Sequence, residues 1–458
     1  MNRRRVEARR AQGAVEVLAW PLAAVVLMAL GAVVGEASPP TSEPRAVAVS
    51  QSVTSCPVAG GLTAATGQVE AGSEGSIRTV TGEEDTTVEL DPAAWVATAG
   101  TGDSAVVRQM GGGGVAFVAG TLPVGDGYTV AACPGVADES WFLGAGTTAR
   151  HPSTLVLTNI ADVPAQVDVE LWGGAGRIDA VNDTGIVVQP GATAQIPLAD
   201  LVVGEAEVAV HVVRRRGVVT AAVVDASTTA LAGSEVLTAS GPPATETVLP
   251  GVAAAGGRTL LLANPGERAA GVSVTAAGPE GGFVPEGLGE LEVPAGTVLP
   301  VALPESVGAE ATGLRVESDE PVLSTVRLAA SEKDYAYASG RDALTGPAVV
   351  PVALGPGAVR PVLHLLADDE TSAVDVELFD AAMQSVGSTS VTVERGTLTA
   401  IDLASPEITA SPDVAYAVVT AKRPVHGAAV YRTGDLISVL TLREAPLEAL
   451  GPRVRPGF

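Results

Sequence analysis

Short segments in which apolar and polar residues alternate recur along most of the chain. Residues 167–171 and 374–378 both read Val-Asp-Val-Glu-Leu, with an apolar residue at every second position. A period of two places the apolar side chains on one face of a β-strand and the carboxylates on the other. These segments are therefore predicted to be strands that are half buried against a core.

The strands belong to a longer pattern that returns about every hundred residues. Val219 follows Val115 by 104 residues, and Val322 and Val425 follow at intervals of 103. Each valine lies in a short apolar segment next to a glycine or a proline. So steady an interval predicts that one module is present about four times.

A hairpin repeats within the second half of the last three copies. Gly191, Gly296 and Gly396 each occupy a turn between two apolar segments. Glycine adopts the left-handed backbone conformation that other residues resist, so each turn is predicted to join two strands. The flanking segments are 187–189 and 194–198, 291–293 and 299–303, and 391–393 and 399–403.

The first half of these three copies also repeats, whereas the first copy lacks a recognisable first half. Leucine-rich segments at 155–159 and 260–264 end in asparagine, and their counterpart at 362–366 ends in Leu366. A second segment typical of a strand follows each of them, at 166–172, 271–275 and 373–379.

These patterns predict an all-β fold of about four tandem β-sandwich units of the immunoglobulin-like kind. With 53 glycines, 32 prolines and 3% aromatic residues, the composition favours short strands and turns. Helical turns are expected at 91–95 and 198–201. A β-propeller is the alternative, if each copy supplies two four-stranded blades.

The predicted division is a basic tail, an apolar anchor, a proline-rich linker and four β units. Their ranges are 1–17, 18–35, 36–45, 46–139, 140–243, 244–344 and 345–458.

Residues 18–35 carry no charge and are long enough to span a bilayer as one helix. Five arginines against two glutamates give residues 1–17 a net charge of +3, which favours a cytoplasmic tail and an extracytoplasmic body. We therefore expect a single-pass signal-anchor in the cell membrane. The alternative is a signal peptide cleaved near Ala37, which would make the body a secreted protein.

Beyond the tail the chain is strongly acidic. The net charge is −25, and because the tail contributes +3, residues 18–458 carry −28. Such a body repels nucleic acid and anionic membrane surfaces, so no nucleic-acid partner is expected.

Cys56 and Cys133 are the two cysteines, and a proline follows each of them. A single pair in an oxidising compartment most simply forms one disulfide. A redox or metal pair is the alternative, although the chain has no Cys-x-x-Cys spacing.

Four histidines are scattered along the chain without the spacing of metal ligands, and neither a His-Glu-x-x-His nor a Gly-x-Ser-x-Gly motif is present. They are His151, His211, His364 and His426. The sequence therefore predicts no catalytic residue, no metal site and no cofactor. His211 alternates with valines in 208–212 and is expected on the exposed face of its strand.

Three other polar segments are interpreted as solvated turns. The carboxylates at 368–370 lie in a predicted loop, with a Ca²⁺ site as the alternative. The arginines at 214–216 lie at a predicted hairpin tip, with an anion site as the alternative. The glycines at 111–114 precede a strand rather than a helix, which argues against a phosphate loop.

Trp172 is the candidate ligand contact. It ends the segment at 166–172 on the face of Asp168 and Glu170, so its ring is expected to be partly exposed. An exposed aromatic ring would suit a sugar, and packing at an edge between units is the alternative interpretation.

Several elements together resemble a known family. They are Cys133-Pro134, Trp141-Phe142-Leu143-Gly144 and the leucine-rich segment ending in Asn159. In combination they resemble an actinobacterial family of single-pass or secreted extracytoplasmic proteins, classed as a domain of unknown function. The resemblance covers most of the chain after the anchor, implies a location in the cell envelope, and brings no catalytic residues.

The function expected from these observations is a non-catalytic, structural or protein-interaction role in the cell envelope. The expected partners are the membrane through residues 18–35 and an envelope protein or cell-wall polymer. A module that binds cell-wall glycans is one alternative, distinguished by an exposed groove at Trp172. An envelope hydrolase is another, distinguished by an acid pair or a His–Ser–Asp cluster that converges in one cleft.

Overall fold

The structure is a computed structural model that describes residues 46–57, 62–69, 75–81, 84–90, 98–99, 104–122, 127–228, 232–253, 256–307, 312–330, 333–354 and 359–450. Within these ranges every regular element is a β-strand, apart from one 3-10 turn. The predicted all-β class is confirmed. The tail at 1–17, the apolar segment at 18–35, the linker at 36–45 and the expected helical turn at 91–95 lie outside these ranges.

No helix of the described residues is long and apolar enough to cross a membrane.

The described strands belong to two compact units. In one, β1 (Ala46–Ala48) pairs antiparallel with β36 (Glu448–Leu450). Residues Val49–Leu447 form the other unit and contain all the remaining strands. The four predicted β units at 46–139, 140–243, 244–344 and 345–458, called stretches below, thus lie mainly within the compact unit Val49–Leu447.

The first stretch contributes two four-stranded sheets, in the orders β2-β7-β4-β5 and β6-β3-β8-β9. Its strands are β2 (Gln51–Pro57), β3 (Thr63–Gln68), β4 (Gly75–Thr81), β5 (Glu84–Leu90), β6 (Thr98–Ala99), β7 (Ser104–Met110), β8 (Gly114–Thr121) and β9 (Tyr128–Ala132).

The second stretch forms two sheets with the orders β10-β17-β13-β14 and β11-β12-β18-β19, and β15 and β16 add to β13 and β12. Its elements are β10 (Glu139–Ala145), β11 (Thr147–Thr148), β12 (His151–Asn159), β13 (Ala165–Gly173), β14 (Gly176–Ile178), β15 (Ile186–Val188), β16 (Thr193–Pro197), η1 (Leu198–Asp200), β17 (Val208–Arg216), β18 (Val219–Thr228) and β19 (Ala232–Leu237).

The third stretch differs because the 18-residue strand β26 takes part in both of its layers and joins them into one eight-stranded sheet. Its strands are β20 (Ala244–Val252), β21 (Arg258–Ala263), β22 (Ala270–Gly278), β23 (Gly281–Phe283), β24 (Leu291–Val293), β25 (Val298–Ala302), β26 (Thr312–Ala329) and β27 (Tyr335–Ser339).

The fourth stretch returns to two four-stranded sheets, in the orders β28-β33-β30-β31 and β32-β29-β34-β35. Its strands are β28 (Ala348–Pro351), β29 (Val362–Leu366), β30 (Ser372–Asp380), β31 (Ser385–Val393), β32 (Leu398–Asp402), β33 (Val414–Ala421), β34 (His426–Thr433) and β35 (Leu436–Thr441).

The predicted hairpin turns have the backbone that glycine was expected to supply. The φ angles of Gly191, Gly296 and Gly396 are 66°, 72° and 70°. Each glycine lies between two of the predicted strands, and η1 occupies the helical turn expected at 198–201. Local sequence therefore determines these turns.

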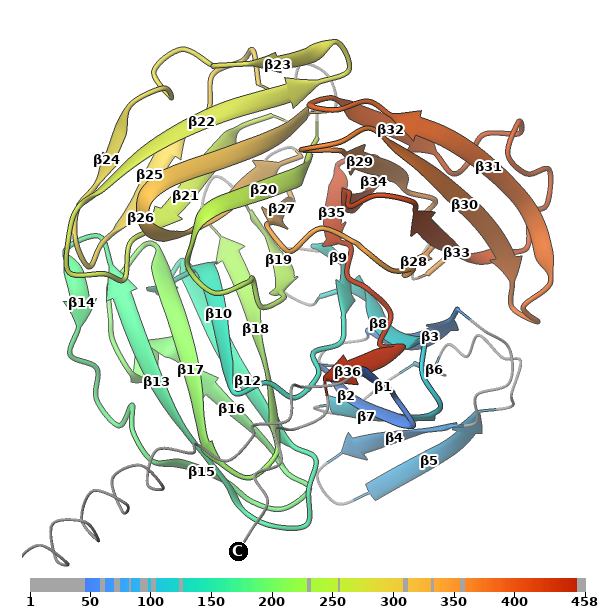
Figure 1. The fold of residues 1–458 in the computed structure, drawn as a ribbon. Helices are drawn as coiled ribbons and strands as arrows, with labels where there is room; N and C mark the ends of the chain where they lie inside the picture. Colours follow the sequence, from blue (N-terminus) through green and yellow to red (C-terminus); the bar gives the residue numbers. More distant parts are fainter. Residues whose placement is uncertain are drawn as a thin grey trace, which may run out of the picture. The chain divides into compact units, whose positions relative to one another are not determined.

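The last strands of the four stretches adjoin one another in a closed cycle. β9 lies beside β19, β19 beside β27, β27 beside β35, and β35 beside β9 (Figure 1). Buried polar groups join them across the stretches. Thr129 of β9 donates to Glu235 of β19, and the Oγ of Ser438 on β35 donates to the same carboxylate at 3.1 Å.

Asp334, the residue before β27, connects β9 and β35. Its Oδ2 accepts from the backbone N–H of Tyr128 on β9, at 3.3 Å, and of Ile437 on β35, at 2.8 Å. Asp334 is fully buried, and its burial raises its pKa to about 7, although the backbone N–H groups oppose that rise.

Cys56 and Cys133 form a disulfide, with an S–S distance of 1.98 Å. The bond links the end of β2 to the residue that follows β9, so it closes the first stretch as the sequence predicted.

Candidate functional site

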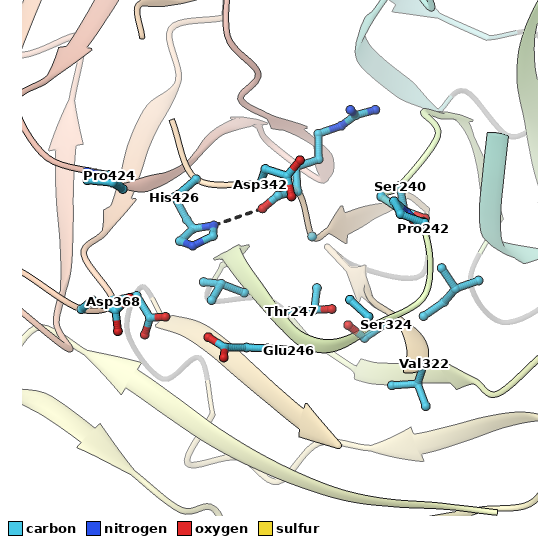
Figure 2. A pocket seen from close by; sticks show the side chains of 18 of the residues that line it. Ser240, Pro242, Glu246, Thr247, Val322, Ser324, Asp342, Asp368, Pro424 and His426 are labelled. Atoms are coloured by element: carbon cyan, nitrogen blue, oxygen red, sulfur yellow. Dashed lines mark hydrogen bonds between the residues drawn. The ribbon is translucent and has the colours of Figure 1, made fainter. Parts of the chain in front are cut away.

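A cavity of about 480 Å³ lies among parts of the second, third and fourth stretches (Figure 2). Its walls come from the loop before β20, from β20 and β26, and from the loops that follow β27 and β29, with the start of β34. Cavities of about 300 and 220 Å³ lie at Trp172 and at His151. Small-molecule sites usually measure about 300–1,000 Å³. The first cavity lies well within that range, whereas the cavity at Trp172 only reaches its lower end, so the first cavity is the candidate site.

Acidic side chains outnumber basic ones around this cavity. Its carboxylates are those of Glu246, Asp342, Asp368, Asp369 and Glu370, and its guanidinium groups are those of Arg341 and Arg423. The excess of carboxylates gives the cavity a negative charge, as is true of the chain as a whole.

Glu246 and Asp368 are joined by one guanidinium group. Arg315 places its Nη2 2.9 Å from Glu246 and its Nη1 2.6 Å from Asp368. Burial raises the pKa of Glu246, the charge of Arg315 opposes that rise, and a hydrogen bond with Asp368 adds to it. Glu246 is therefore the member of the pair that binds a proton more readily than an ordinary glutamate.

His426 faces the cavity as a neutral imidazole. Its Nδ1 lies 3.1 Å from the carbonyl oxygen of Arg341, as the dashed line in Figure 2 marks. A carbonyl oxygen only accepts, so Nδ1 carries the proton of the ring. Burial lowers the pKa of His426, and the neutral ring leaves Nε2 as a hydrogen-bond acceptor.

Ser324 contributes a hydroxyl group that has no hydrogen-bond partner. The residue is 3% exposed, and its Oγ is buried. It lies on β26 two residues after Val322, and both residues line the cavity (Figure 2). A hydroxyl that makes no hydrogen bond within the protein can pair with a polar ligand atom that lies beside it.

The loop at 368–370, interpreted from sequence as a solvated turn, forms one wall of the cavity. Asp368 is partly buried against Arg315, whereas Asp369 and Glu370 are exposed. The part of the chain that the structure describes has no group of three or more His, Cys, Asp or Glu side chains arranged to hold a metal ion.

The arginines at 214–216 lie at the end of β17, and two of them form ion pairs with carboxylates outside their own hairpin. Arg214 pairs with Asp138, and Arg215 places its Nε 2.5 Å from Asp168. The glycines at 111–114 lie at the turn between β7 and β8, as expected.

Trp172 and His211 are buried, which corrects the expectation that their faces are exposed. Trp172 is 5% exposed and His211 is 8% exposed. His211 stacks on Trp141 of the neighbouring strand with ring centroids 3.8 Å apart, and Trp172 lies 5.3 Å from Trp141. The alternation identified the correct face, but that face is covered by these rings.

Both nitrogens of His211 are held by carboxylates. Nδ1 lies 3.0 Å from Glu170, and Nε2 lies 3.0 Å from Glu139. Trp172 borders the cavity of about 300 Å³ together with residues of the next stretch, among them Pro265 and Pro321. The neighbouring stretch therefore shares in covering the rings.

His151 belongs to a buried charged network at the smallest of the three cavities. Its Nδ1 lies 2.9 Å from the carbonyl of Ala206, and its Nε2 lies 3.1 Å from Asp225. Burial alone would lower the pKa of His151, but the hydrogen bond and charge of Asp225 raise it above its ordinary value. Asp225 also accepts from the hydroxyls of Tyr335, at 2.7 Å, and Tyr337, at 3.0 Å.

His364 is buried in another environment. Its Nδ1 lies 3.2 Å from the carbonyl of Pro250, and burial lowers its pKa to about 4. Each of the four imidazoles thus has a carbonyl or a carboxylate as a partner.

Residues 97–404 match a family of unknown function, DUF5719, and the chain belongs to that family. The resemblance to a family of unknown function is therefore confirmed. No match was found among the curated proteins.

Proposed function

We propose that this chain is a non-catalytic, structural or protein-interaction component of the cell envelope. The observation that carries the proposal is the closed cycle of β9, β19, β27 and β35, because it joins repeated stretches into one body. Such a body holds the loops between stretches in fixed positions, which favours presentation of binding surfaces. The disulfide between Cys56 and Cys133 is consistent with an oxidising compartment.

The location is part of the same proposal. Residues 18–35 would anchor the chain in the membrane with its arginine-rich tail inside, as in an actinobacterial envelope protein. Cleavage near Ala37, which would release a secreted body, is the alternative.

The sheets support four two-sheet units of the immunoglobulin-like kind as the finer architecture. The first, second and fourth stretches each contribute a pair of sheets, and β26 links the layers of the third. A propeller of eight four-stranded sheets is the alternative.

The test is crosslinking in the producing cells with a reagent that does not cross the membrane. Adducts between this chain and an envelope protein or cell-wall polymer are expected, and the same reagent should leave cytoplasmic proteins unmodified. If no adduct forms, and the chain is modified only after the cells are broken, the body lies in the cytoplasm and the proposal is wrong.

Binding of cell-wall glycans is the second candidate, favoured by the cavity that Trp172 and Trp141 line. The burial of Trp172 argues against a flat aromatic platform. Saturable co-sedimentation of the chain with isolated cell walls, lost in Trp172→Ala, would favour this candidate.

A hydrolase is the third candidate, because Glu246 and Asp368 do converge in one cavity. The two carboxyl groups share the guanidinium group of Arg315, which lies between them at 2.9 Å from Glu246 and 2.6 Å from Asp368. The acid pairs of glycosidases are instead separated by about 5–9.5 Å, which leaves room for the bond that is cleaved. The geometry therefore disfavours glycoside hydrolysis at this pair.

A further inference from the structure

The cavity at Glu246 and Ser324 combines three features that together define a ligand. They are a set of hydrogen-bond acceptors from separate elements, one buried hydroxyl without a partner, and an apolar wall. Each feature restricts the chemistry of what fits.

The acceptors come from three parts of the chain. Glu246 lies on β20, Asp342 lies in the loop after β27, and Asp368 follows β29 (Figure 2). The neutral imidazole of His426 adds an acceptor at Nε2. A ligand group that satisfies several acceptors at once must carry several N–H donors, as an ammonium or a guanidinium group does.

The charge favours a cation as well. Five carboxylates line the cavity against the guanidinium groups of Arg341 and Arg423. When Arg315, which bonds Glu246 and Asp368, is counted with these two, the carboxylates still exceed the cations by two. An anionic ligand would therefore be repelled, and a cationic one attracted.

Ser324 supplies an observation that does not depend on the acidic cluster. Its Oγ is buried on the cavity wall and makes no hydrogen bond in the protein. An N–H donor in the cavity would give this hydroxyl a partner.

The remaining wall is apolar and suits a short hydrocarbon chain. Val248, Val322 and Pro424 line it, and the two valines are almost fully buried. Methylene groups are stabilised when they leave water for such a surface.

We propose that this cavity binds a primary ammonium or guanidinium group carried on a short aliphatic chain. The ligand is either a small amine or the lysine or arginine side chain of a partner protein, since both present the same chemistry. The inference names a ligand class for the interaction role proposed above. It rests on that role in one respect, which is that the bound ligand is not chemically changed.

The experiment is a titration of the full-length chain in detergent micelles, followed by calorimetry and by NMR of the ligand. Pentylammonium is the cation, and pentanol and pentanoate are the neutral and anionic controls of equal chain length. We expect saturable binding of pentylammonium at pH 7, at least tenfold weaker binding of pentanol, and no binding of pentanoate.

Three variants locate the site. Ser324→Ala removes the hydroxyl without a partner, so we expect several-fold weaker binding with an unchanged or raised Tm. Asp342→Asn should weaken binding at least as much. Glu292→Gln, which neutralises an exposed carboxylate on β24 of the same stretch, is the matched control and should bind as the unmodified chain does.

Nα-acetyl-lysine methylamide and 1,5-diaminopentane distinguish the two sources. Tighter binding of the lysine derivative indicates a protein side chain, and tighter binding of the diamine indicates a small amine. The proposal is wrong if pentanol binds as tightly as pentylammonium, or if Ser324→Ala and Asp342→Asn bind the cation as the control does.

Failure here and failure of the non-catalytic role give different signals. Weak or nonspecific amine binding leaves the crosslinking result in cells untouched. Conversely, a bound amine whose NMR spectrum changes chemically over hours would contradict the non-catalytic role while leaving the binding site in place.

Discussion

Asn159 and Asn264 make the same three hydrogen bonds in successive stretches. The Nδ2 of Asn264 donates to the carbonyls of Arg268 and Val293, at 2.7 and 3.0 Å, and its Oδ1 accepts from the N–H of Gly266 at 3.0 Å. The bonds of Asn159 have the same separations of 2, 4 and 29 residues. One fully buried amide thus connects the end of a strand to the hairpin that follows it.

The first prediction concerns Asn264→Leu, which introduces the residue type found at Leu366. The change leaves the buried carbonyl of Val293 without the amide and removes the bonds to Arg268 and Gly266 in the exposed loop, so we expect a loss of about 2 kcal/mol in the free energy of unfolding. Urea denaturation measures it. Asn182→Gly is the control, because Asn182 is exposed with a φ of 55° and should lose almost nothing. Equal losses in the two variants would contradict the assignment.

The second prediction concerns the pH dependence that Asp334 introduces. Its pKa is raised from 3.8 to about 7 in the folded chain. Between these pH values the folded state therefore holds a proton that the unfolded state has released. The stabilisation that this proton contributes is fully present below about pH 4 and is lost as the pH rises through about 7. Asp334→Asn keeps an oxygen for Tyr128 and Ile437 but removes this titration, so the fall in stability that Asp334 causes should be absent from the variant. The buried Glu235, whose pKa burial also raises, titrates in both chains.

Thermal denaturation from pH 4 to 8 measures the difference between the two chains. The relative stability of Asp334→Asn should rise with pH by an amount on the order of 4 kcal/mol. The buried His364, with its pKa lowered to about 4, acts in the opposite direction in both chains and cancels in the comparison. A difference that stays constant with pH would show that Asp334 is ionised throughout.

At the scale of elements, β26 carries a proline near the middle of an 18-residue strand. Residues 313–318 pair with β22 and residues 323–328 pair with β21, so Pro321 lies between the two runs. Proline lacks an N–H and is tolerated where the ladder needs none. This position lets one strand change from one layer to the other.

The third prediction moves the proline into the ladder. Thr325 is buried and pairs with Leu261 on one side and Ser339 on the other. Thr325→Pro should therefore cost about 3 kcal/mol or more, whereas Pro321→Ala should change the stability by less than about 1 kcal/mol. Urea denaturation of the two variants gives the comparison, and a tolerated Thr325→Pro would mean that the strand is not continuous there.

The positions of strands and turns could be predicted from the sequence, but which elements pack against one another could not. The period of two predicted the buried Val167, Val169 and Leu171 of β13, and the conformation of Gly296 was predicted from its turn. Such signals act within a few residues. The cavity could not be predicted, because the loop at 368–370 was interpreted as a solvated turn and Glu246 comes from a strand more than a hundred residues earlier.

The same limit explains the error at His211. Alternation states which face of a strand a residue lies on, and it says nothing about what covers that face. Trp141 lies on the neighbouring strand β10, and its ring stacks on His211. Pairing between β10 and β17 spans about seventy residues, so a local pattern could not reveal that the outer face is covered.

At the scale of the whole molecule, the disulfide closes a long loop. Cys56 and Cys133 are 77 residues apart, so the bond restricts the unfolded chain and should stabilise the fold by about 4 kcal/mol in the chain-entropy model. The fourth prediction is that the double change Cys56→Ser and Cys133→Ser lowers the free energy of unfolding by that order. Denaturation with and without a reductant checks it, since the reductant should affect only the unmodified chain.

The fifth prediction follows from the closed cycle of last strands. Asp334 bonds both β9 and β35, and Glu235 bonds both Thr129 and Ser438, so the first and last stretches are held through the second and third. Removing residues 345–458 would expose these buried carboxyl groups and the apolar strands beside them. We therefore expect the shortened chain to lose its cooperative thermal transition, whereas the full chain should unfold residues 49–447 in one transition by scanning calorimetry. Independent sandwiches would behave differently, because three of them would still melt at their original temperatures after the fourth was removed.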